Sequence, residues 1–172
     1  DILRVHIKIM LIKLKTKDTL IIDDFKLKCC IGKGGFKSKK KEGDLSTPQG
    51  IFKLGPLYYR NDRVQKPITK LKCYKIKKNM GWCNDVNSKY YNRKIIIKKN
   101  IKHEKIFRRD HKYDYVILIN YNYQKPISNK GSAIFLHLTN NYKPTLGCIA
   151  LKKKDLLILL KIAKRNTKIK IN

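Results

Sequence analysis

Apolar residues recur along most of the chain in short runs with the spacing of β-strands. In residues 25–31 the odd-numbered positions hold Phe, Leu, Cys and Ile, whereas lysines occupy positions 26 and 28. This alternation places one face of a strand against a core. Residues 113–120 and 133–138 are dominated by aromatic and aliphatic side chains, which is typical of buried strands. Further strands are expected in residues 5–14, 19–22, 51–54, 71–76, 95–97 and 168–171.

One segment, Asp155 to Arg165, has helical spacing instead. Its apolar residues recur at intervals of three and four, which gives a helix one face for packing on a core. The members of that face are Leu156, Leu159, Leu160 and Ala163. No internal repeat or break in composition divides the 172 residues. We therefore expect a single, mainly β domain over residues 1–172 with one or two helices, in which residues 1–10 are a candidate extension.

Two stretches have the composition of connections. Residues 32–50 are rich in Gly and Lys and include Pro48. We expect a lysine-rich surface loop there, because the glycines lack the G-K-[ST] sequence of a phosphate-binding loop. Residues 82–93 contain Trp, Tyr, Asn and Asp and are interpreted as a polar connection. Tyrosines interleaved with lysines either anchor such loops on the core or stack on nucleic-acid bases, and the sequence leaves both open.

The charge is extreme: 42 basic against 12 acidic residues give a net charge of +30. Such a surface attracts polyanions, either nucleic acid or anionic wall polymers. However, 35 of the basic residues are lysines and only seven are arginines. Specific phosphate or base recognition favours arginine, and Lys, Ile and Asn rise together when coding DNA is A/T-rich. We therefore attribute the charge first to this compositional drift and to solubility, with weak, nonspecific polyanion binding as the alternative. No apolar run approaches the roughly 18 residues of a membrane span, and no secretory leader pattern is visible.

The five cysteines show no metal-binding spacing, so no metal site is expected. A bridge between Cys73 and Cys83 remains open, as does the oligomeric state. Cys148 differs from the others because it follows Gly147 directly, after a turn that contains Pro144. A glycine lets a substrate approach the backbone, and free N–H groups beside a thiol can bind an oxyanion.

His137 lies in the apolar run before this turn, which places a base and a thiol in one short segment. We therefore interpret Cys148 as a nucleophile and His137 as the base that makes its thiolate. Thr145 can orient the turn or the histidine through its hydroxyl, and the Gly147 and Cys148 N–H groups are the candidate oxyanion donors. The alternative is a structural cysteine beside a core histidine.

The stretch from His137 to Thr145-x-Gly147-Cys148 resembles the active-site signature of the L,D-transpeptidase (YkuD-type) catalytic domain. Other segments are similar to the same family in matching order. They are Asp44-x-x-Thr47-Pro48-x-Gly50-x-Phe52, Trp82-Cys-Asn-Asp, Tyr91-Asn-Arg93, Arg108-x-Asp110-x-x-Tyr113-Asp114 and Gly131-Ser-Ala-Ile-Phe-x-His137. From these segments we take Asp44, Thr47, His111 and Tyr113 as candidate substrate-binding residues.

The resemblance implies a β-sandwich-like domain with a flanking helix and a cysteine-dependent acyltransferase. Cys148 would attack a peptidoglycan tetrapeptide stem, release D-alanine, and transfer the acyl group to a stem-peptide amine to give a 3→3 cross-link. No cofactor is required, and the implied location is the bacterial cell envelope or periplasm. An L,D-carboxypeptidase or endopeptidase on the same fold, and a basic nucleic-acid-binding protein with a structural Cys148, are the alternatives. The chain departs from many members at Leu146, where they have histidine, and at Ala150, where they have arginine.

Overall fold

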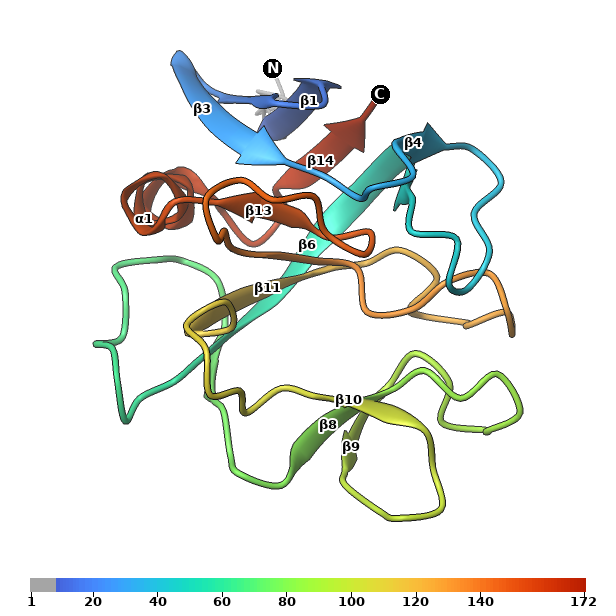
Figure 1. Ribbon diagram of the computed structural model, residues 1–172. Coiled ribbons are helices and arrows are strands. Elements are labelled where there is room, and N and C mark those ends of the chain that lie inside the picture. Colours follow the sequence, from blue (N-terminus) through green and yellow to red (C-terminus); the bar gives the residue numbers. More distant parts are fainter. Residues whose placement is uncertain (1–8) are drawn as a thin grey trace, which may run out of the picture.

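The computed structural model describes residues 9–172, and its regular structure consists mainly of strands (Figure 1). Nine strands form one sheet in the order β11-β12-β13-β3-β2-β1-β14-β6-β7. Their bounds are β1 Leu11–Thr16, β2 Thr19–Ile22, β3 Phe25–Cys30, β6 Gly50–Tyr59, β7 Cys73–Lys75, β11 Tyr115–Ile119, β12 Phe135–Leu138, β13 Ile149–Leu151 and β14 Lys168–Ile171. The predicted mainly β fold class is confirmed. Part of the strand expected in residues 5–14 lies outside the described residues.

The long strand β6 closes the sheet on itself. Its first residues pair with β14 in the register Lys168↔Lys53, and its second half pairs with β11 in the register Val116↔Tyr58. One ten-residue strand thus belongs to both sides of a barrel-like sheet. This arrangement gives the central strands two covered faces, as in a sandwich.

Strand β11 shows how the two faces are filled. Its residues Tyr115, Ile117 and Ile119 pack in the main core, together with three leucines of the helix α1 (Lys153–Ile162). Val116 and Leu118 point the other way, into a second core that contains Trp82 and Phe135. Because side chains alternate across a strand, a continuous apolar run can serve two cores at once.

A small sheet covers the second core. It has the order β10-β8-β9, with β8 at Met80–Cys83, β9 at Lys94–Ile96 and β10 at His103–Lys105. In Figure 1 this small sheet and α1 lie on opposite sides of β11. The expectation of a polar connection at residues 82–93 is therefore wrong at its start. Trp82 is 1% exposed and donates a hydrogen bond through Nε1 to Asn92 Oδ1 at 2.8 Å.

The glycine-rich stretch is also more closely packed than a surface loop. It contains the two-stranded sheet of β4 (Phe36–Lys37) and β5 (Thr47–Pro48). Ser46 and Thr47 are fully buried. Tyrosine hydroxyls tie other loops down, as in the Tyr115 Oη bond to Gln65 O at 2.8 Å. No helix in residues 9–172 is long and apolar enough to cross a membrane.

Candidate active site

Two neighbouring strands bring the candidate base and nucleophile together. His137 lies in β12, and Cys148 immediately precedes β13. These strands are parallel, with Leu136 opposite Ile149 and His137 opposite Ala150. The register places Cys148 beside Phe135, and residues two apart on a strand share a face. His137 and Cys148 therefore open on the same side of the sheet, toward the small sheet.

The Cys148 thiol lies at the bottom of this opening and is only 8% exposed. Its Sγ donates to Ala133 O at 3.1 Å and accepts the Phe135 N–H at 3.4 Å. Burial raises the pKa of the thiol to about 12, and the nearby Glu104 carboxylate acts in the same direction. The Phe135 N–H and Lys40 oppose this rise without cancelling it. The thiol is consequently protonated at rest.

His137 is buried and neutral as well. Its Nδ1 lies 2.8 Å from Leu138 O. Because a carbonyl oxygen only accepts, Nδ1 carries the proton and Nε2 keeps its lone pair. Burial, together with the charges of Lys112 and Arg108, lowers the pKa of His137 to about 4, and the hydrogen bond to Leu138 O only partly opposes this shift. The resting pair is thus thiol and imidazole rather than thiolate and imidazolium.

The turn before Cys148 is held by its own hydroxyl group. Thr145 Oγ1 donates to Cys148 O at 2.5 Å and accepts the Gly147 N–H at 3.1 Å. Gly147 has φ +143°, and a Cβ there would lie 2.8 Å from Ser46 O. Both its backbone conformation and the space around it therefore require glycine. Leu146 projects from this turn with 79% of its surface exposed, at the mouth of the opening.

A second loop supports the turn from behind. Thr47 Oγ1 donates to Gly147 O at 2.8 Å and accepts the Gly32 N–H at 2.9 Å. A Cβ on Gly32 would lie 2.9 Å from Gly147 Cα, so the two backbones touch. Glycines have no side chain, so the glycine-rich stretch allows this close approach. The glycines that led us to expect a surface loop are therefore needed for packing against the turn before Cys148.

Asp44 holds the same loop through its carboxylate. Oδ1 accepts from Lys40 Nζ at 2.7 Å and from the Ser46 N–H at 2.9 Å, and Oδ2 accepts the Lys41 N–H at 2.8 Å. Burial opposes ionisation of Asp44, but these hydrogen bonds prevail and hold its pKa well below the usual range. The Lys40 side chain is 3% exposed and its Nζ lies 3.6 Å from the Cβ position of Gly147. An ion pair is thus buried directly behind the turn at residues 145–147, which we call the nucleophile turn after the predicted role of Cys148.

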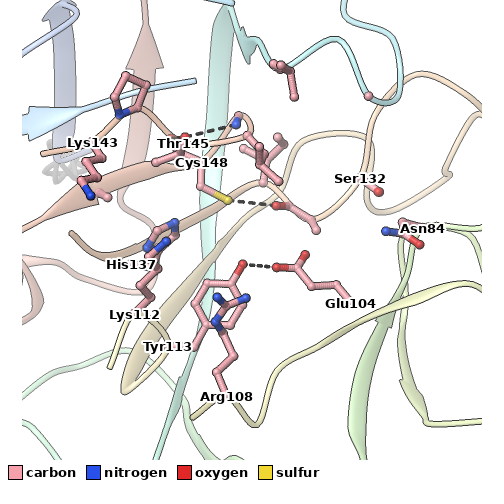
Figure 2. Close-up of a pocket in the computed structure, with 18 of the residues that line it drawn as sticks. Asn84, Glu104, Arg108, Lys112, Tyr113, Ser132, His137, Lys143, Thr145 and Cys148 are labelled. Atoms are coloured by element: carbon pink, nitrogen blue, oxygen red, sulfur yellow. Dashed lines mark hydrogen bonds between the residues drawn. The ribbon is translucent and has the colours of Figure 1, made fainter. Parts of the chain in front are cut away.

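A cleft of about 460 Å³ opens over Cys148 and His137 (Figure 2). Four basic side chains line it, namely Lys102, Arg108, Lys112 and Lys143. Ala150 also lines the cleft and is 1% exposed. Many relatives have arginine at the position of Ala150. In this chain the cations come from other segments, and they give the cleft a positively charged wall although position 150 holds alanine.

The predicted substrate-binding residues occupy different places. Tyr113 lines the cleft, and its ring meets that of His137 edge to face at a centroid distance of 5.2 Å. His111 is exposed outside the lining, where Nε2 lies 3.2 Å from Thr139 O. Asp44 and Thr47 lie behind the turn, with their polar atoms bonded within the protein. We propose that these two residues support the nucleophile.

Sequence reasoning missed several residues that line the cleft. Glu104 in β10 faces the Tyr113 hydroxyl, which donates a short hydrogen bond to its Oε1. Glu42 accepts a short hydrogen bond from Ser132 Oγ. Acidic residues are scarce in this chain, with 12 against 42 basic residues, and that scarcity could have singled out Glu104 and Glu42 as candidate functional residues. All five cysteines are free, including Cys73 and Cys83. No group of three or more His, Cys, Asp or Glu in residues 9–172 is arranged to hold a metal ion.

The described residues thus form a closed β-sheet that places a buried cysteine and a buried histidine in one cleft. The family model of the L,D-transpeptidase catalytic domain (YkuD) matches residues 8–171. The chain therefore belongs to this family, whose members act on peptidoglycan. None of the curated proteins compared with it matches the chain.

Proposed function

We propose that this protein is a peptidoglycan L,D-transpeptidase in which Cys148 forms a thioester with a tetrapeptide stem. The observation that carries the proposal is the placement of Cys148 and His137 on one face of two paired strands, at the bottom of one cleft. Membership of the family supports the same reaction. The cationic wall suits a substrate that carries carboxylates, as stem peptides do.

The acylation step uses the neutral resting pair. His137 Nε2 takes the thiol proton as the sulfur attacks the carbonyl carbon of the third stem residue. Transferring the proton during attack avoids a resting thiolate, which burial and Glu104 disfavour. The Cys148 N–H is the proposed donor to the tetrahedral oxyanion. The Gly147 N–H, which bonds to Thr145 Oγ1, has to exchange partners to assist.

Collapse of the intermediate breaks the C–N bond to the terminal D-alanine. The His137 imidazolium donates its proton to the departing amine, which leaves the neutral imidazole and the acyl-enzyme. A stem-peptide amine then attacks the thioester, and the thiolate leaves and is reprotonated. Water as the acceptor gives the carboxypeptidase reaction from the same acyl-enzyme. We place this activity at the bacterial cell wall, where the lysine-rich surface is matched to anionic polymers.

The test is the mass of the intact protein after incubation with a carbapenem, followed by identification of muropeptides after incubation with peptidoglycan. We expect one adduct on the wild type and none on Cys148→Ala. Cys30→Ala, which removes a buried thiol outside the cleft lining, serves as the matched control and keeps the adduct. An unmodified wild type, or an equal adduct on Cys148→Ala, overturns the proposal. Trimmed stems without cross-links identify the carboxypeptidase instead.

A further inference from the structure

Glu104 is a carboxylate in a cleft whose other charged groups are mostly cations. It lies in the middle of β10, opposite Trp82 of β8, and this pairing fixes its backbone. Figure 2 shows its carboxylate and the Tyr113 hydroxyl bonded to each other close to the Cys148 sulfur. The Tyr113 ring is itself held edge to face against Phe135, at a centroid distance of 5.9 Å. The carboxylate is thus positioned by two elements.

This carboxylate has no ion-pair partner in the part of the chain that the structure describes. The charge of Arg108 acts on Glu104 from a distance, but the Arg108 guanidinium forms its salt bridge with Asp110, at 2.6 Å from Nη2 to Oδ2. A buried charge without a partner is costly, so an acid that only supports the fold is expected to have one. The cleft therefore offers a carboxylate without an ion-pair partner to whatever enters it.

We propose that Glu104, held by Tyr113, binds the ammonium group of the acyl acceptor and takes its proton before it attacks the Cys148 thioester. This inference rests on the proposed function and adds a catalytic residue to its second half-reaction. In this inference Glu104 takes the first proton of the acceptor ammonium group, and His137 takes the second proton after the nitrogen has attacked. The acceptor class is a primary amine on a stem peptide, recognised by charge at its nitrogen.

The bound R–NH₃⁺ gives one proton to the Glu104 carboxylate, and the lone pair of R–NH₂ forms the new C–N bond at the thioester carbonyl. The nitrogen of the tetrahedral intermediate then gives a second proton to His137 Nε2. The C–S bond breaks, and the imidazolium protonates the Cys148 thiolate. The amide keeps the third hydrogen, and Glu104 releases its proton to solvent.

The charges in the cleft agree with this order of proton transfers. Burial raises the pKa of Glu104, although the Tyr113 hydrogen bond opposes the rise. A carboxylate of higher pKa is a better base for an ammonium group. Its negative charge raises the pKa of Cys148, which disfavours a departing thiolate. Once Glu104 has gained the proton this repulsion vanishes, so the thiolate departs more easily at the step that needs it.

The experiment measures cross-linked and hydrolysed products from a tetrapeptide donor and a second stem as acceptor, between pH 6 and pH 10. We expect Glu104→Gln to lower the ratio of transfer to hydrolysis about a hundredfold near neutral pH, the lower end of the usual range for a catalytic base. The ratio should recover as the pH rises, because the acceptor amine then loses its proton in solution. Tyr113→Phe keeps the carboxylate and should give a smaller loss. Asp24→Asn, in an exposed turn, is the charge-matched control.

The carbapenem adduct on Cys148 distinguishes the two proposals. An unmodified wild type overturns the proposed function and this inference with it. An adduct on wild type and on Glu104→Gln, with an unchanged ratio of transfer to hydrolysis, overturns the inference alone. The inference also fails if Glu104→Gln loses the adduct, since Glu104 then supports the nucleophile rather than the acceptor. A loss of transfer without recovery at high pH likewise rules out the role as a base.

Discussion

Thr47 Oγ1 donates a hydrogen bond of 2.8 Å to the carbonyl oxygen of Gly147, one hundred residues further along the chain. The same hydroxyl accepts the Gly32 N–H at 2.9 Å, so one side chain joins three segments. This bond connects the upstream motif around Asp44 to the nucleophile turn. It indicates that the motif's role here is to fix the backbone that presents Cys148.

Removal of this hydroxyl should be costly for both stability and reactivity. Thr47→Val keeps the shape but leaves the Gly32 N–H and the Gly147 carbonyl unsatisfied in a buried site. We expect the free energy of unfolding to fall by about 1–3 kcal/mol, and carbapenem acylation of Cys148 to slow. Urea unfolding and adduct mass measure the two effects. Thr47→Ser, which retains the hydroxyl, should lose less of both, and equal losses in the two variants would contradict this role.

The Lys40–Asp44 pair gives a second prediction. Asp44→Asn leaves a buried ammonium group without its counter-charge, and breaking such a pair costs about 3–5 kcal/mol. We expect the lower end of that range because the Asp44 side chain is 12% exposed. The double variant Lys40→Met/Asp44→Asn removes both charges and should recover part of the stability in urea unfolding. A double variant less stable than Asp44→Asn would show that the Lys40 charge stabilises this region by another route.

The local spacing of apolar residues was sufficient to predict many of the strands and the helix. The strands at residues 19–22 and 168–171 were predicted with the bounds found, the first from a short apolar run that ends at a turn and the second from alternation. The helix was expected at residues 155–165 and spans Lys153–Ile162 instead. The lysines at its start continue the helix, whereas Ala163 has the extended angles φ −59° and ψ 142°. Helix ends depend on such local angles more than on apolar spacing.

Pairing between distant segments could not be inferred in this way. Met80–Cys83 contains a glycine and is only four residues long, so it forms a strand through pairing with β9 and β10 rather than through propensity. Glu104 reaches the cleft through that same pairing. The motif indicated the roles of His137 and Cys148, but their shared face follows from the β12–β13 register. Likewise, their neutral resting state depends on burial, which the sequence does not report.

That resting state leads to a third prediction. With the pKa of Cys148 at about 12 and that of His137 at about 4, the wild type should carry no thiolate at neutral pH. The ultraviolet absorbance of wild type minus Cys148→Ala should show thiolate only well above pH 9, the ordinary pKa of a cysteine, because burial raises this pKa to about 12. His137→Ala should slow carbapenem acylation at pH 7 by a hundredfold or more, because proton transfer during attack is lost. A thiolate signal at pH 7 would instead indicate a resting ion pair.

The buried imidazole should also make the fold sensitive to acid. The pKa of His137 is about 4 in the folded protein, below its ordinary value of 6.5, so the unfolded chain binds the proton first as the pH falls. Stability should therefore decline between pH 6.5 and pH 4, by about 3 kcal/mol from this group. His137→Asn cannot take up this proton, so its free energy of unfolding should vary less across the same interval, whatever its absolute stability. Urea unfolding at several pH values measures the slope, and His111→Asn, which replaces an exposed histidine, controls for the loss of a histidine. If wild type and His137→Asn show the same slope, His137 is not held neutral by the fold.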